Sequence, residues 1–222
     1  MSSSTGSKVI SVKPLPPRLS KTCILTIDTH RIEYEGPDGK LRTWEAMQRT
    51  TRPKDSPVDA VTIVAIRNES AAVGPEVLLE KQFRPPAGAV VVEFPAGLMD
   101  AGETTDECAA RELREETGYV GDIVPDVAGA RPVFFGCEWQ TPPASSSSRT
   151  VVINVRVDLG RAENQNPTPQ LEADEFIVPF WVPVKSLHAE CRKLHDEGFA
   201  IDSKVGIFAE GIEVAKLWQP AL

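Results

Sequence analysis

The 222-residue sequence predicts an α/β fold, a mixed sheet flanked by helices. Three observations favour this class. Strongly β-like runs recur between residues 58 and 183, a well-delimited glutamate-rich helix lies between them, and two further helical segments follow at about 184–197 and 203–217. Strands interleaved with helices in this way are typical of a sandwich in which helices cover the sheet.

Residues 1–22 are predicted to be a flexible N-terminal tail. The segment is rich in serine, carries Lys8, Lys13, Arg18 and Lys21, and contains no acid, a composition similar to that of a transit peptide. Its three prolines, Pro14, Pro16 and Pro17, would break an amphipathic helix, however. We therefore expect a tail that leads into the first strand.

Residues 23–56 are predicted to form a small β domain. Short apolar or alternating runs indicate strands at Cys23–Thr29 and His30–Tyr34, and a turn at 36–40 precedes a third strand at Leu41–Arg49. A unit of this size buries too little surface to be stable alone. We expect it to pack on the rest of the chain or on a second subunit.

Residues 57–222 are predicted to form the main domain, which begins after the proline-containing linker 52–57. A Pro-Pro-Ala-Gly interruption at 85–88 separates two of its strands, a serine-rich loop at 141–148 is expected to be mobile, and a second loop spans 160–174. The predicted strands are 58–67, 77–83, 90–94, 134–135, 151–157 and 175–183.

The composition limits the class of partner. A net charge of −8 with no basic run argues against nucleic acid as a ligand, and no apolar run approaches the roughly 20 residues of a membrane span. The four cysteines are scattered without a C-x-x-C pair, which is typical of a reduced intracellular protein. We expect a cytoplasmic protein, with the nucleus as the alternative and mitochondria less favoured.

The glutamate-rich helix has clear ends in the sequence. Thr104 and Glu107 form a T-x-x-E capping box, so the helix should begin near residue 105, and Gly118 can adopt the left-handed conformation that ends it. The helical period places Glu112, Glu115 and Glu116 on one face. It turns other side chains toward a core: Ala109, Ala110, Leu113 and Thr117.

Clustered glutamates repel one another unless a cation neutralises them. Hard oxygen ligands at this density suit Mg²⁺ or Mn²⁺. The alternative is a solvated acidic helix in which Arg111 and Arg114 act as counter-charges, since surface charge runs are common.

The full string resembles the Nudix box, G-x5-E-x7-R-E-U-x-E-E-x-G-U, in which U is a bulky apolar residue. Tyr119 is a loose fit to the last apolar position. The resemblance implies hydrolysis of a nucleoside diphosphate linked to another group. The matching residues are Gly97, Glu103, Arg111, Glu112, Leu113, Glu115, Glu116, Gly118 and Tyr119.

Outside the box, the chain resembles the ADP-sugar pyrophosphatase branch, in particular eukaryotic, fungal-type ADP-ribose pyrophosphatases. This resemblance implies a Nudix α/β/α sandwich with an N-terminal β domain, a homodimer with shared active sites, and Mg²⁺-dependent cleavage of ADP-ribose to AMP and ribose 5-phosphate. The matching stretches are 42–52 (RTWEAMQRTTR), 80–86 (EKQFRPP), 92–98 (VEFPAGL) and 174–176 (DEF).

The resemblance also implies roles for residues of the catalytic and metal site. Glu112 and Glu116 would be the main metal ligands, Glu115 would share in them, and the backbone carbonyl of Ala96 would add a further ligand. Arg111 would hold the box carboxylates in register. Glu175, in the acidic loop that also contains Glu172 and Asp174, would be the general base.

For substrate binding, the resemblance assigns Trp44 to stacking on adenine, and Glu45 and Arg49 to the base edge or neighbouring groups. Arg84 would contact the diphosphate, because a planar guanidinium suits phosphate oxygens. Glu93 would position metal or substrate, or it would be a buried strand carboxylate paired with an arginine.

This chain departs from the branch in three places. In the acidic loop, which carries Glu172, Asp174 and Glu175, the position of the general base is left open, with Glu175 as the candidate. The region around 25–26 has no tryptophan for the second face of the adenine, and the 141–148 loop lacks the usual Pro-Gly turn.

Two other functions remain open. One is a Nudix hydrolase of oxidised nucleoside diphosphates or of dinucleotides such as NADH. The other is a non-catalytic nucleotide-sensing module, against which the complete glutamate set counts, since binding alone does not need it.

Overall fold

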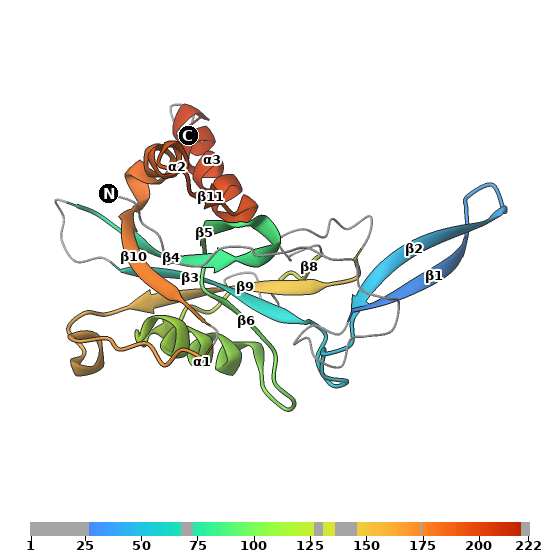
Figure 1. Cartoon of the computed structure of the whole chain (residues 1–222), viewed down its shortest axis with the longest axis horizontal. Helices are drawn as coiled ribbons and strands as arrows, with labels where there is room; N and C mark the ends of the chain where they lie inside the picture. Colours follow the sequence, from blue (N-terminus) through green and yellow to red (C-terminus); the bar gives the residue numbers. More distant parts are fainter. Residues whose placement is uncertain (1–26, 68–72, 127–130, 136–145, 174, 219–222) are drawn as a thin grey trace.

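The computed structural model describes residues 27–67, 73–126, 131–135, 146–173 and 175–218. It confirms the predicted α/β class: a large mixed sheet has helices on both faces, and the first two strands of the chain form a separate two-stranded sheet (Figure 1). The predicted tail, residues 1–22, lies outside the described residues. No helix of the described part is long and apolar enough to cross a membrane.

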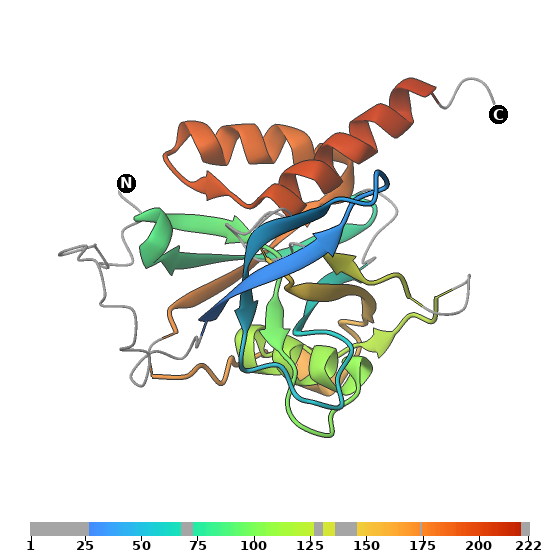
Figure 2. The same cartoon turned by 90° about the vertical axis from the view of Figure 1, so that its right-hand side faces the viewer.

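The N-terminal sheet is a hairpin of β1 (Ile27–Glu35) and β2 (Leu41–Arg49). The two short strands predicted before residue 35 are wrong as separate elements, because residues 27–35 pair without interruption along β2. The 36–40 turn is as predicted: the Gly36 N–H donates to the Lys40 carbonyl at 2.9 Å, and Gly39 has a φ of 71°, which glycine adopts without strain. Figure 1 shows the hairpin extending away from the body of the molecule, and in Figure 2, where that side faces the viewer, it lies in front of the large sheet.

The nine described strands of the large sheet run in the order β11-β5-β4-β3-β9-β7, with β10 on β4, β6 on β3 and β8 on β9. β3 pairs with β9 in parallel, and β5 with β11, whereas the other pairs are antiparallel. The six predicted strands are confirmed, and three short ones were missed: β6, β7 and β11. The bounds are β3 Ala60–Arg67, β4 Glu76–Arg84, β5 Ala89–Glu93, β6 Ala96–Leu98, β7 Asp122–Ile123, β8 Phe134–Phe135, β9 Arg149–Val157, β10 Ile177–Pro183 and β11 Ala200–Ile201.

The helices complete an α/β/α arrangement. α1 (Thr105–Thr117) covers one face of the sheet, while α2 (Leu187–Asp196) and α3 (Ser203–Trp218) cover the other (Figure 1). Each face has its own apolar core: Ile63, Leu78 and Leu113 belong to the core on the α1 side, and Leu79 and Val92 to the core on the α2 and α3 side.

Two details differ from the sequence predictions. Ala109, Leu113 and Thr117 of α1 are buried as expected, but Ala110 is exposed, because the helix contacts the sheet along a narrower stripe than assumed. Residues 141–145 of the serine-rich loop lie outside the described residues, whereas Ser146 and Ser148 are buried and share a hydrogen bond of 2.9 Å between their hydroxyls.

Candidate active site

The carboxylates of α1 are presented by a helix whose ends are locally encoded. The Thr104 hydroxyl accepts from the Glu107 N–H at 3.3 Å, and the Glu107 carboxylate accepts from the Thr104 N–H at 2.9 Å, which completes the predicted capping box. At the other end, Gly118 has a φ of 76° and ends the helix in the left-handed conformation.

Arg111 holds one side of the glutamate cluster in register. Its guanidinium donates to both oxygens of Glu103 at 2.8 and 3.0 Å, to Glu112 at 2.8 Å, to Glu115 at 3.1 Å and to the Leu98 carbonyl at 3.0 Å. These hydrogen bonds lower the pKa of Glu103, and they raise that of Arg111. Arg111 therefore is a counter-charge to these glutamates, and the same contacts orient the carboxylates of the Nudix box.

Glu112 lies against the backbone at the start of the box. A side chain on Gly97 would overlap the Glu112 carboxylate, so only glycine allows this approach. Burial raises the pKa of Glu112, while the Arg111 charge opposes that shift. By contrast, the Glu115 side chain is 41% exposed.

Glu116 is the most deeply placed of the three predicted glutamates. It is 4% exposed, and its carboxylate accepts from the Ala96 N–H at 3.0 Å, which ties α1 to β6. Burial and the neighbouring charges of Glu80 and Glu112 raise the pKa of Glu116 well above its ordinary value. The structure thus brings Ala96 beside Glu116, and the observed contact uses the N–H group of Ala96.

Sequence reasoning missed Glu80. This residue lies on β4, is fully buried, and neither of its carboxylate oxygens has a hydrogen-bond partner within the described residues. Its Cα is paired with that of Glu93 on the neighbouring strand β5. The available signal was a charged residue directly after the apolar run 77–79 of a central strand, where carboxylates are rarely buried unless they are paired.

Arg84 and Glu93 form an ion pair. Arg84 Nε donates to Glu93 Oε1 at 2.8 Å, and Glu93 is 5% exposed, whereas the Arg84 side chain is 37% exposed. Glu93 is thus a buried strand carboxylate paired with an arginine, and its role in positioning metal or substrate stays a prediction. Arg84 keeps enough exposure to contact a ligand as well.

Glu175 belongs to the same electrostatic group. Its charge contributes to the raised pKa values of Glu80, Glu112 and Glu116, and its carboxylate accepts from the Glu172 N–H at 2.9 Å. Asp174, the third acid of that loop, lies outside the described residues. The loop therefore brings one predicted carboxylate toward the α1 cluster.

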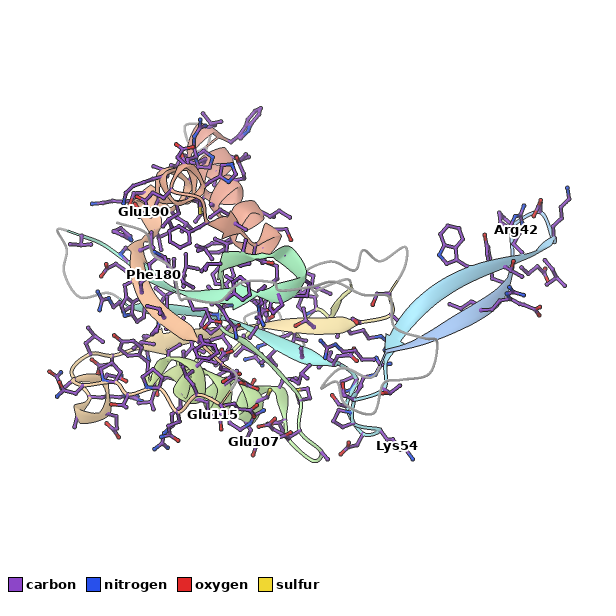
Figure 3. The ribbon with its side chains drawn as sticks, viewed as in Figure 1. Arg42, Lys54, Glu107, Glu115, Phe180 and Glu190 are labelled. Atoms are coloured by element: carbon purple, nitrogen blue, oxygen red, sulfur yellow. The ribbon has the colours of Figure 1, made fainter. Side chains whose placement is uncertain are left out.

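The remaining predicted residues lie elsewhere in the chain. Trp44, Glu45 and Arg49 are on β2 of the hairpin, which makes no more than marginal contact with the other described elements. Figure 3 shows the hairpin extending to the right of the body, away from the helix on which Glu115 is labelled. One chain therefore does not bring the predicted adenine site and the carboxylates together.

Comparison with known proteins agrees with the box. A model of the NUDIX domain matches residues 56–201. The chain belongs to the Nudix family. It is 40% identical over 190 residues, 86% of this chain and 78% of the relative, to an ADP-ribose pyrophosphatase of Saccharomyces cerevisiae. It is 38% identical to an uncharacterized Nudix hydrolase of Schizosaccharomyces pombe, over 96% of each chain, and 36% identical to a mouse ADP-sugar pyrophosphatase, over 78% of this chain and 74% of the relative.

Nudix hydrolases generally use a divalent metal ion. Within the described residues, no three histidine, cysteine, aspartate or glutamate side chains converge as a ready metal cage. The donor chemistry fits such an ion nevertheless, because Glu112 and Glu116 supply hard oxygens, and the buried Glu80 carboxylate beside them lacks a hydrogen-bond donor. Bound there, a divalent cation would relieve the mutual repulsion of these Nudix carboxylates.

Proposed function

We propose that this Nudix hydrolase cleaves ADP-ribose, and to a lesser extent other ADP-sugars, to AMP and the sugar phosphate, with Mg²⁺ as the metal and Mn²⁺ as a substitute. The observation that carries the proposal is the 40% identity, over 86% of this chain, to a relative named ADP-ribose pyrophosphatase. The mouse relative named ADP-sugar pyrophosphatase supports the same substrate class.

In the proposed mechanism, Glu112 and Glu116 would hold the metal ion together with the Ala96 carbonyl, and Glu115 would share in the site. The bound ion would supply neutralisation of the diphosphate charge and a lowered pKa for the attacking water. Arg111 keeps Glu112 and Glu115 in place through its hydrogen bonds.

Two further side chains act on the substrate in this proposal. The exposed part of Arg84 contacts diphosphate oxygens, while Glu93 fixes its guanidinium at 2.8 Å. Glu175 accepts the proton of the attacking water. One phosphorus–oxygen bond of the diphosphate bridge breaks, and water supplies the new oxygen, so the products of ADP-ribose are AMP and ribose 5-phosphate.

We propose a homodimer formed through the hairpin. Cross-strand register places Ile32 opposite Trp44 and Tyr34 opposite Arg42, so three large apolar side chains share one face of a two-stranded sheet. Ile32 is 45% exposed, Trp44 51% and Tyr34 40%. Such a patch on a marginal hairpin favours burial against a second copy, which would also carry Trp44, Glu45 and Arg49 to the partner's carboxylates.

A substrate panel tests the proposed activity. The purified protein is incubated with Mg²⁺ and with ADP-ribose, ADP-glucose, NADH or an oxidised nucleoside diphosphate, and the products are identified by chromatography. We expect AMP and ribose 5-phosphate from ADP-ribose at the highest kcat/KM. Faster turnover of NADH or an oxidised nucleotide would replace the substrate assignment, and binding of all four without turnover would support a nucleotide-sensing module. A cytoplasmic location, which we also propose, is checked by fluorescence microscopy of a tagged protein.

A further inference from the structure

Glu80 is a buried carboxylate without a hydrogen-bond partner in the described part of the chain. It lies on β4 with strands on both sides, its Cα paired with Glu93 of β5 and with Pro179 of β10, and its side chain has no exposed surface. Transfer of an ionised carboxylate from water to such a place is very costly unless an opposite charge or a donor meets it. The sheet alone gives no reason to retain a glutamate here.

The side chain of Glu80 is directed toward the α1 carboxylates. Strand alternation puts it on the same face as Leu78, which packs in the core with Leu113 of α1. Electrostatics gives the same placement: after burial itself, the charge of Glu80 is the strongest influence on the pKa of Glu116. Glu93, Glu112 and Glu175 act on Glu80 in the same unfavourable direction.

The nearby arginine does not satisfy Glu80. Arg84 lowers the repulsion by its charge, but its Nε donates to Glu93, and both Glu80 oxygens are left without a donor within the described residues. Arg111 is hydrogen-bonded to Glu103, Glu112 and Glu115. Ionised together, these carboxylates would carry more negative charge than the two arginines neutralise, and burial raises the pKa of Glu80 and Glu116 well above the ordinary value.

We propose that Glu80 is an additional carboxylate ligand of the divalent-metal site and acts beside Glu116. The inference rests on the metal dependence in the proposed function and extends it to a residue outside the Nudix box. A divalent cation prefers several oxygen ligands, and carboxylates at one site remain charged together only when such a cation is bound. The fully buried, donor-free oxygens of Glu80 are the feature that this ligand role explains.

The test measures metal binding to the substrate-free protein. Mn²⁺ is titrated into wild type, Glu80→Gln and Glu76→Gln, and free Mn²⁺ is followed by electron paramagnetic resonance. Glu76 is the matched control, because it is a buried glutamate of the same strand, roughly 13 Å away along β4, and is ion-paired with Arg67 at 2.9 Å. We expect Glu80→Gln to weaken the tightest Mn²⁺ site by at least about 10-fold. The Mn²⁺ affinity of Glu76→Gln should stay within about twofold of wild type, because a residue that is not a ligand should have a much smaller effect.

Thermal unfolding separates a ligand role from a packing role. In excess chelator, Glu80→Gln should be at least as stable as wild type, because glutamine cannot carry the buried charge. Added Mn²⁺ should then raise the Tm of wild type more than that of Glu80→Gln. Unchanged Mn²⁺ affinity in Glu80→Gln, or an equal Tm increase in both proteins, would overturn the proposal.

The same preparations distinguish this inference from the proposed function. If wild type hydrolyses ADP-ribose with Mg²⁺ and Glu80→Gln binds Mn²⁺ normally, only the role of Glu80 is wrong. If Glu80→Gln loses Mn²⁺ affinity but wild type cleaves no nucleoside diphosphate sugar, the metal ligand stands and the substrate assignment fails.

Discussion

The region around α1 and the N-terminal hairpin differ in which kinds of side chain are buried and which are exposed. Around α1, charged groups are partly or fully buried and connected: Arg111 bridges three glutamates, and Glu116 is tied to the Ala96 N–H. On the hairpin, large apolar groups are half exposed on one face, and β1 and β2 contact mainly each other. The buried charges and the exposed apolar groups are each unfavourable alone.

The contrast indicates that the two regions require different partners. The carboxylates need a cation, which a single chain with a bound metal provides. The hairpin needs apolar surface, which the described part of one chain does not offer it. We therefore expect changes on the α1 side to affect chemistry and changes on the hairpin to affect assembly and substrate affinity.

Deletion of residues 1–50 should abolish both dimerisation and detectable ADP-ribose binding, because it removes the apolar face of the hairpin and Trp44 with it. Light scattering coupled to gel filtration gives the mass, and calorimetry gives the binding. Circular dichroism controls for folding of the remaining domain, whose two apolar cores lie in residues 58–212. A folded monomer with unchanged affinity for ADP-ribose would contradict both roles of the hairpin.

A pair of point variants sharpens the same test. Ile32→Lys places a charge on the apolar face, whereas Thr43→Lys places it on the opposite face, across from Glu33. Both positions are exposed in a single chain, so neither variant should unfold the main domain. Ile32→Lys should be monomeric and Thr43→Lys dimeric, and equal masses for the two would show that this face is not the interface.

Glu116→Gln should lower kcat by on the order of 10²-fold or more, comparable with the loss of a single electrostatic stabiliser of a transition state. Steady-state kinetics with ADP-ribose and Mg²⁺ measures the effect, with the surface variant Glu213→Gln on α3 as the control. Thermal unfolding should show little loss of stability. Activity within a few-fold of wild type would mean that the other carboxylates hold the metal without Glu116.

Trp44→Ala should weaken ADP-ribose binding by about 1–3 kcal/mol, the range for base–aromatic stacking. The change should appear in KM and leave kcat nearly unaltered, since the adenine lies away from the bond that breaks. Quenching of tryptophan fluorescence by ADP-ribose should also be lost in this variant. Quenching that survives would place the nucleotide near Trp139, Trp181 or Trp218 instead.

Thr104→Ala should cost about 0.5–2 kcal/mol of stability through loss of the capping box. It should change kcat little, because Arg111 and the contact between Glu116 and Ala96 still position the carboxylates. Chemical denaturation and steady-state kinetics on the same preparation check both parts. A loss in kcat much larger than the loss in stability would show that the cap itself orients the site.

The local features of this chain were readable from its sequence because neighbouring residues produce them. The capping box, the glycine that ends α1, the hairpin turn and the β-like runs each depend on residues within a few positions of one another. The length of β1 was misjudged because its polar residues look like a break, although pairing with β2 continues through them. The short strands β6, β7 and β11 were missed because two or three residues carry no period.

The sequence by itself therefore determined the α/β class, the Nudix box and the one-sided arrangement of glutamates on α1. Only the tertiary structure decided that Glu80, more than 30 positions before Glu116, lies with it and without a hydrogen-bond donor in the described residues. It also decided that Arg84 is fixed by Glu93 and that β2, which contains Trp44, belongs to a hairpin that extends from the body (Figure 1). The physical reason is that burial and charge proximity depend on how strands and helix pack, and residue spacing along the chain does not encode that packing directly.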